Sequence, residues 1–318
     1  MTAAPLGPGS VSLGLAVPGG PATEAVVRLA ETAVAAVEAG FDGVTLSEHH
    51  GGFPGYLPTP VLVAGLLQER LPCGWAIACP MIIPLRSTAL VAEELAWLAA
   101  AHPGRVAAGF VPGYQERDFT LVGADYTSRR ERYWAQLAEL STLLRGTSGA
   151  DGNGLAEDPA IAALAATPVP VVGGVAGRSG ARRAAAASAG MLLTSLADAG
   201  EVAGIVDAYR AAGGSGPRVL IRRVWVGEVR ATGAEAKLGR WRAASDGAAW
   251  LARPPTAIAT GHPDAVVDRL VADARTGGAT ALNIRIDVDS TDHADVLAQI
   301  GELGRSVLPA LHGTLAAR

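Results

Sequence analysis

Cysteine is scarce in this 318-residue chain, which contains only Cys73 and Cys79, on either side of the apolar run WAIA. Two cysteines so placed indicate free thiols in a reducing compartment and not a framework of disulfide bridges. The first residues, MTAAPLGPGS, also lack the charged and apolar segments of a secretory signal. We therefore expect a cytoplasmic protein.

Long apolar runs and excess charge are absent as well. No run approaches the ~20 apolar residues that span a bilayer, so we expect a soluble protein without a membrane partner. The 26 basic and 30 acidic residues are spread without long blocks of one sign. This balance gives no basic cluster that would bind nucleic acid or an anionic membrane surface. A small neutral or weakly charged molecule is the expected partner.

What the chain does have is enough apolar sequence for a large core, with 49% hydrophobic residues. Short apolar or β-branched runs alternate with longer helical patterns, as in parallel βα units. The expected strands cover 11–18, 41–50, 75–84, 105–114, 168–175, 191–198, 217–229 and 280–288. The expected helices cover 25–40, 61–71, 87–104, 128–144, 181–190, 201–213, 234–252, 263–278 and 292–311.

Eight βα units close most naturally into a barrel, so we predict one α/β domain, a (β/α)8 TIM barrel over residues 1–318. The segment around 146–167 is rich in Gly, Asp and Asn and is expected to be a loop excursion. A doubly wound open sheet is the competing architecture. It lacks support because AVPGGPAT, after the first strand, does not match the GxGxxG turn of such folds.

In a barrel, residues directly after the strands meet at one mouth, and the densest polar group there is Ser47, Glu48, His49 and His50. Adjacent histidines on an extended strand point to opposite faces, and no zinc-type spacing lies nearby, so we expect no metal site. His49 is either functional or a structural histidine with its hydrogen bonds satisfied.

Two further segments follow strands. In VVGGVAGRSGARRAA, a glycine-rich turn over 173–180 leads into a helix, where backbone amides, Ser179 and either Arg178 or Arg182 could hold a phosphate. Such turns are also common without a ligand. In RVAAGFVPGYQERDF, the strand is followed by Tyr114, Glu116 and Asp118, which could equally form an ordinary polar loop.

Several of these segments together resemble the luciferase-like flavin monooxygenases. The resemblance rests on GFDGVTLSEHH, on the long run from IIPLRSTAL to TSRRERYW, on PVPVVGGVAGRSGARRAAAASAG, on TGHPDAVVDRLVADARTGGATALNIRI and on VLPAL, in the family's order. It covers nearly the whole chain. It implies a barrel that binds reduced FMN and uses molecular oxygen to oxidise a small organic substrate.

The resemblance also implies roles for individual residues. His49 matches the histidine beside the isoalloxazine ring, with Glu48 in the same motif. Trp75 and Ala76 match a strained cis peptide under the ring, and Cys79 lies on the same strand end. Together with Tyr114, His49 and Cys79 form the expected catalytic set.

Gly177, Arg178 and Ser179, preceded by Gly173 and Gly174, match the loop that holds the FMN phosphate. Glu48 and Val111 are expected to line the cofactor as well. Val111 stands where light-emitting members have a reactive cysteine, and Pro112 replaces an arginine that helps bind the phosphate. Both departures argue against light emission, and the second implies weaker FMN binding.

The implied partners are a separate flavin reductase and a second copy of the chain, packed through the apolar helices at 61–71 and 87–104. The reaction could be hydroxylation, epoxidation or Baeyer-Villiger insertion. Two alternatives remain open. One is hydride transfer with the deazaflavin F420 on the same barrel, and the other is a catalytically idle barrel that binds flavin or serves as a partner subunit.

Overall fold

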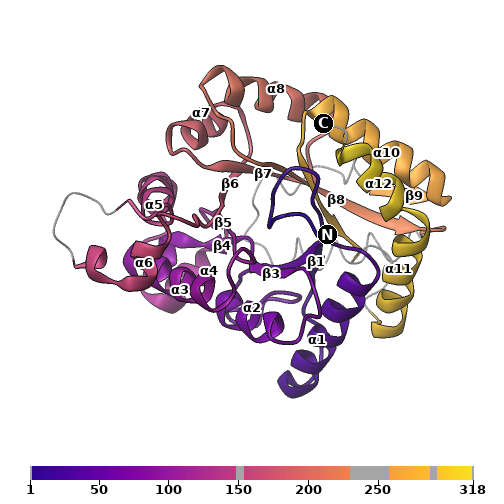
Figure 1. Cartoon of the computed structure of the whole chain (residues 1–318), viewed down its shortest axis with the longest axis horizontal. Coiled ribbons are helices and arrows are strands. Elements are labelled where there is room, and N and C mark those ends of the chain that lie inside the picture. Colours follow the sequence, from indigo (N-terminus) through magenta and orange to yellow (C-terminus); the bar gives the residue numbers. More distant parts are fainter. Residues whose placement is uncertain (1, 148–153, 230–257, 287–291, 317–318) are drawn as a thin grey trace.

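The computed structural model describes residues 2–147, 154–229, 258–286 and 292–316. The strands lie at the centre and the helices surround them (Figure 1). The strands are β1 (Val11–Leu15), β2 (Gly43–Leu46), β3 (Trp75–Ala78), β4 (Met81–Ile82), β5 (Ala108–Val111), β6 (Val171–Val175), β7 (Gly190–Leu193), β8 (Arg218–Val226), β9 (Ile258–Gly261) and β10 (Ala281–Arg285).

The strands form a parallel sheet in the order β3-β2-β1-β10-β8-β7-β6-β5-β4, with β9 beside β8. Only Cys79 and Pro80 separate β3 from β4, so these two short strands act as one barrel strand. Because β3 pairs with β2 and β4 pairs with β5, this strand closes the ring. Within the described residues the ring therefore has eight strands, and the predicted TIM barrel is confirmed.

The helices follow the strands in the expected alternation. They are α1 (Ala22–Glu38), α2 (Pro60–Gln68), α3 (Thr88–Ala101), α4 (Glu116–Val122), α5 (Arg129–Leu143), α6 (Pro159–Ala163), α7 (Arg178–Ala186), α8 (Ala199–Ala211), α10 (Pro263–Gly277), α11 (His293–Ser306) and α12 (Leu308–Ala316), with 3₁₀ turns η1 (Ile83–Leu85) and η2 (Leu155–Glu157). Among the described helices, none is long and apolar enough to cross a membrane.

The helices form where apolar residues recur at helical spacing. In α5, for example, the buried residues Tyr133, Leu137 and Leu140 are four and three positions apart. They pack on the outer surface of the barrel strands β5 and β6, where the Tyr133 hydroxyl donates to the carbonyls of Phe110 and Gly174. One apolar face per helix thus fixes the helix to the ring.

Three expectations differ from the structure. Part of the 146–167 excursion is helical, because Asp158 caps α6 and the following Ala160 and Ile161 are buried. The polar stretch after β5 forms helix α4. The helix expected over 292–311 divides at Val307 into α11 and α12. The helix expected over 234–252 lies outside the described residues.

Alternate residues of each strand face the interior of the barrel. In β10, Ala281 belongs to the interior cluster, whereas Leu282 and Ile284 pack outward against the helices. The interior cluster comprises Leu6, Trp75, Ile77, Cys79, Ala107, Val172, Leu192, Val219 and Ala281. It fills the interior from Leu6 and Trp75 at the amino end up to Cys79, which follows β3, and the polar groups gather at the carboxyl end.

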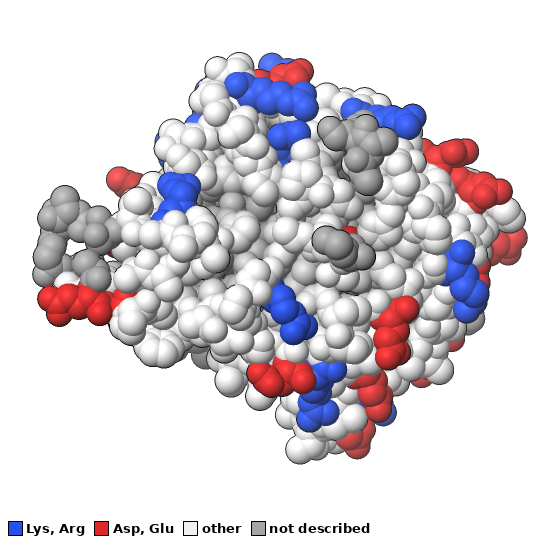
Figure 2. All heavy atoms as spheres, in the orientation of Figure 1, with Lys and Arg blue, Asp and Glu red and all other residues white. Residues whose placement is uncertain are grey.

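Charged side chains of both signs are scattered over the surface. On the face drawn in Figure 2, uncharged atoms occupy most of the centre, and no broad area of one sign is visible. This face therefore shows no basic surface of the kind that binds nucleic acid.

Candidate active site

The candidate site lies at the carboxyl end of the barrel. His49 follows β2, Tyr114 and Asp118 follow β5, and the glycine-rich turn follows β6. All ring strands run parallel, so these segments meet at one mouth, the usual position of active sites in such barrels.

His49 is buried and paired with Asp118, which lies on α4. The His49 Nδ1 and an Asp118 carboxylate oxygen are 2.6 Å apart. The other carboxylate oxygen accepts the backbone N–H of His50 at 3.0 Å. Because an ionised carboxylate only accepts hydrogen bonds, Nδ1 must carry a proton, and Nε2 is the ring atom left to accept or donate another.

Three aromatic rings surround the His49 imidazole. Phe53 stacks on it at a centroid distance of 4.3 Å, and the edges of Tyr56 and Tyr114 meet it at 4.6 and 5.0 Å. Phe53 and Tyr56 come from the loop between β2 and α2, and Tyr114 comes from the turn after β5. The rings fix the plane of the imidazole and limit the access of water to it.

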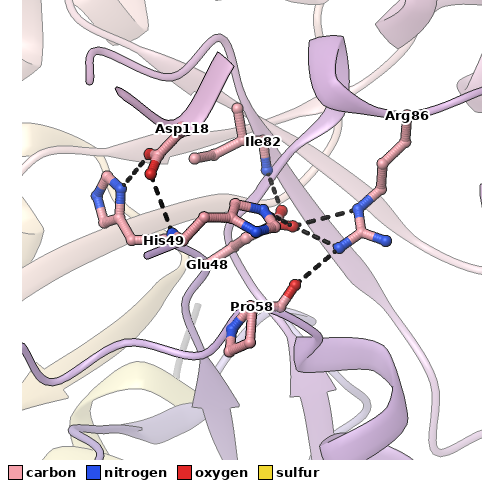
Figure 3. Close-up of polar contacts among 7 residues, drawn as sticks. Glu48, His49, Pro58, Ile82, Arg86 and Asp118 are labelled. Carbon is pink, nitrogen blue, oxygen red and sulfur yellow. Dashed lines mark hydrogen bonds and ion pairs between the residues drawn. The ribbon is translucent and has the colours of Figure 1, made fainter. Parts of the chain in front are cut away.

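Glu48 holds the neighbouring backbone in place, as Figure 3 shows. One carboxylate oxygen accepts the N–H of Ile82 at 2.6 Å. The other accepts from the Arg86 guanidinium and from His50. Arg86 also donates to the carbonyl of Pro58 at 3.0 Å. The Glu48 side chain is 0% exposed, so it acts as a positioning residue and is not free to contact a cofactor.

The turn between β6 and α7 is open at its tip. Gly177 precedes the helix, no side chain caps the helix there, and no atom lies within 4 Å of an added Cβ on this glycine. Arg178 and Ser179 are exposed in the first turn, whose amides have no acceptor within the helix. Free amides, a helix N-terminus and open space are what a phosphate group requires. The turn therefore fits the phosphate of FMN.

The other residues expected at this turn face in different directions. Gly173 faces helix α5, where an added Cβ would lie 2.7 Å from Leu137. Gly174 faces the interior and contacts Val111, the last residue of β5. The Arg178 guanidinium extends toward Gly204 on α8 and away from the turn. The backbone amides and Ser179, more than Arg178, are therefore placed where they could contact a phosphate.

Gly113 shapes the turn that carries Tyr114. Its φ of +75° is a left-handed conformation that favours glycine, and an added Cβ would lie 2.7 Å from Ile82. Pro112 and Gly113 thus redirect the chain after β5, so that Tyr114 and, in the first turn of α4, Asp118 both reach His49.

Trp75 and Ala76 are not part of this cluster. They begin β3, at the amino end of the barrel, where the Trp75 indole donates to the carbonyl of Ala3 at 3.1 Å. The cis peptide expected between them is absent, and within the described residues the cis bond is Cys79–Pro80. Trp75 and Ala76 lie away from the mouth because only the last residues of β3 approach it.

Cys79 directly follows the last residue of β3, but its thiol is buried against Gly109. Burial raises its pKa to about 12, and the Arg285 charge only partly offsets that effect. A neutral, enclosed thiol is a poor nucleophile. Cys79 therefore does not fit the expected catalytic set.

Several residues of the site were not predicted from the sequence. Asp118 was expected only as part of a possible polar loop, and no role was expected for Phe53, Tyr56 or Arg86. One signal was available for the rings, since aromatic residues make up only 5% of the chain and two of them lie in the short loop GGFPGY beside the histidines. No comparable signal marked Arg86.

Comparison with known proteins agrees with this fold. The family model described as luciferase-like monooxygenase matches residues 9–281. The chain therefore belongs to the luciferase-like monooxygenase family. A search of curated protein sequences gave no match.

Three solved structures illustrate the range of similar proteins. Monooxygenase RslO1 from Streptomyces bottropensis has a TM-score of 0.78 and 18% identity, covering 94% of this chain and 99% of that one. An F420-dependent secondary alcohol dehydrogenase has a TM-score of 0.73 and 14% identity, with 95% and 98% coverage.

The oxygenating constituent of 3,6-diketocamphane monooxygenase from Pseudomonas putida, in complex with FMN, has a TM-score of 0.70 and 15% identity, with 95% and 98% coverage. At such identities these likenesses establish the shared fold and leave the cofactor open.

Proposed function

We propose that this protein is a flavin-dependent monooxygenase that uses reduced FMN and molecular oxygen to oxidise a small organic substrate. The observation that carries the proposal is the buried His49–Asp118 pair, with its 2.6 Å contact at the mouth of the barrel. Reduced FMN would supply the electrons for oxygen activation. A separate flavin reductase would deliver it, since one of the similar structures is the oxygenating constituent of its enzyme.

Each part of the site has a task in this proposal. The β6–α7 turn binds the phosphate through backbone amides and Ser179. Asp118 holds His49 in one tautomer, so that Nε2 can exchange a proton with a group bound at the mouth. Phe53, Tyr56 and Tyr114 keep water from that nitrogen, and Glu48 with Arg86 fixes the chain around it.

The proposal is tested by mixing enzyme-bound reduced FMN with oxygenated buffer and following flavin absorbance by stopped flow. We expect the wild type to show a lag before oxidised FMN appears. In His49→Asn the lag should shorten, and coupled product should fall on the order of 10²-fold, the usual contribution of an acid/base group. The matched control is His312→Asn, because His312 lies at the amino end and bonds the Gly40 carbonyl.

The same assay separates the alternatives. Identical traces for wild type and His49→Asn, at matched folded fraction, would remove the catalytic role of His49. Binding of F420 with hydride transfer, and no reaction of bound reduced FMN with oxygen, would favour the F420 enzyme. The similarity to an F420-dependent dehydrogenase motivates this second candidate. Flavin binding without any turnover would indicate an idle barrel.

We also propose that the protein is a homodimer formed through α2 and α3. Leu62, Leu66, Leu90 and Trp97 on these helices are 52 to 63% exposed, an apolar surface that a second copy would cover. Light scattering should give the mass of a dimer, and the double variant Leu62→Glu/Leu66→Glu should give a monomer with an unchanged circular dichroism spectrum. A wild-type monomer at micromolar concentration would refute the dimer.

A further inference from the structure

An arginine lies at the floor of the mouth, on the side away from the β6–α7 turn. Arg285 is the last residue of β10 and follows Ala281 and Asn283 in the alternation that faces the barrel interior. The intervening residues Leu282 and Ile284 pack outward. The Arg285 side chain therefore extends into the mouth, where it is half-buried.

The position of this side chain depends on a glycine in the next strand. An added Cβ on Gly14, in β1, would lie 2.1 Å from the Arg285 Nε. The guanidinium thus crosses β1 at the one place where the strand has no side chain, and it reaches β2. There its Nη2 donates to the hydroxyl of Ser47 at 3.1 Å.

Neutral groups fix the guanidinium in this position. Its Nε donates to the Asn283 side-chain oxygen at 2.9 Å. The Asn283 amide in turn donates to the hydroxyls of Ser12 at 2.9 Å and Thr45 at 3.0 Å. This chain of bonds crosses three strands, so the arginine is held before any ligand arrives.

The charge of Arg285 is left without a counter-charge among the described residues. None of their carboxylates lies within ion-pair distance, and Asn283 and Ser47 use two of the five guanidinium N–H donors. Arg223 is its register partner on β8 and faces the same side of the sheet. A half-buried cation in such a place favours a bound anion.

We propose that Arg285 binds an anionic group of the organic substrate, with a carboxylate as the chemical class that suits its planar donors best. The inference rests on the proposed function, which assigns the β6–α7 turn to the FMN phosphate and leaves the β8–β10–β1 side to the substrate. Ser47, which contacts Arg285, is two residues from His49, so an anion held here would lie beside the reacting groups. The proposed substrate is therefore an anion and not the neutral or weakly charged molecule expected from the composition.

The test uses two pairs of probes that differ in charge, benzoate with benzamide and hexanoate with hexanamide. Calorimetric titration of the protein without reduced FMN should show each carboxylate binding at least about tenfold more tightly than its amide, the scale of a charged hydrogen bond. Arg285→Gln should abolish that preference, and Arg285→Lys should retain part of it. Arg28→Gln, an exposed arginine on α1, should behave as wild type.

Two results would overturn the proposal. One is the lack of carboxylate preference in the wild type, including the lack of any carboxylate binding. The other is a preference that Arg285→Gln leaves intact, above all if that variant weakens the binding of dithionite-reduced FMN, which would assign the cation to the flavin. Failure of FMN to bind the wild type would instead refute the monooxygenase, while the carboxylate preference could still be measured.

Discussion

The two ends of the barrel are built from different chemistry. At the amino end, Leu6 and Trp75 fill the interior, and the Asp42 carboxylate ties down the backbone N–H groups of Ala3 and Val11 at 2.7 and 2.8 Å. At the carboxyl end, the interior positions carry Ser47, Asn283 and Arg285.

The difference indicates a division of labour between the two ends. Apolar burial at the amino end stabilises the fold, and each polar group at the carboxyl end loses hydration that its neighbours must replace. His49, Glu48 and Asp118 are all buried and all hydrogen-bonded, which is the arrangement such groups require. Substitutions at the two ends should therefore separate stability from activity.

The largest effect is expected at the amino end, for Trp75→Ala. Trp75 is 1% exposed, so its removal should lower the free energy of unfolding by ~3 to 5 kcal/mol. FMN affinity per folded molecule should not change, because the indole lies far from the mouth. Urea denaturation and a flavin titration measure the two quantities.

Val27→Ala, at an exposed position on α1, is the control and should change the free energy of unfolding very little. A loss of FMN affinity in folded Trp75→Ala would contradict the idea that the amino end serves stability alone.

Asp118→Asn should show the opposite behaviour at the carboxyl end. The amide cannot supply the charge that holds His49 and the His50 backbone, so coupled product should fall on the order of 10²-fold while the protein stays folded. Turnover at matched folded fraction, with the lag in flavin oxidation, gives the result. Asp125→Asn is the control, because Asp125 is exposed and bonds only Thr127 and Ser128 nearby. Full activity in Asp118→Asn would contradict the role given to the pair.

The strands and the mouth could be predicted from the sequence because both depend on local signals. Alternating short apolar runs and helical patterns gave the barrel, and the polar residues after strand 2 gave His49. The pairing of His49 with Asp118 could not be read in this way, since 69 positions separate them. Only closure of the ring between β2 and β5 brings the two side chains together.

The sequence also did not show at which end of a strand each residue lies. A four-residue strand is ~13 Å long, so its first and last residues lie at opposite ends of the barrel. Trp75 was assigned to the mouth although it begins β3. Arg285 was not predicted as a site residue because its place on the interior face of β10 becomes evident only from Ala281 and its neighbours in the barrel.

A smaller effect is expected for Gly177→Asp at the β6–α7 turn. The new carboxylate would cap the helix amides itself and repel a phosphate, so FMN affinity should fall by about tenfold. Stability should not fall, because the φ of −174° is extended backbone and the added side chain meets open space. Fluorescence titration with FMN gives the affinity. Gly313→Asp, on α12, adds the same charge in open space at the amino end. Equal FMN affinities for the two variants would contradict the assignment of the phosphate to this turn.

The smallest effect on turnover is expected for Cys79→Ala, which should stay within about twofold of the wild type at neutral pH, because an enclosed neutral thiol is a poor nucleophile.

The variant should differ from the wild type in its stability at high pH. Burial raises the Cys79 pKa from the ordinary 9.0 to about 12. Above pH 9 the unfolded chain therefore releases a proton that the folded chain retains, and the wild type should lose about 1.4 kcal/mol of unfolding free energy per pH unit up to pH 12. In Cys79→Ala the unfolding free energy should not show this loss with rising pH. In Cys73→Ala, which removes an exposed thiol, the loss should remain. Denaturation at pH 8 and pH 10 checks the slope, and iodoacetamide at pH 8 should label Cys73 alone. Labelling of Cys79 in the folded enzyme, or a loss of turnover as large as that of Asp118→Asn, would restore it to the catalytic set.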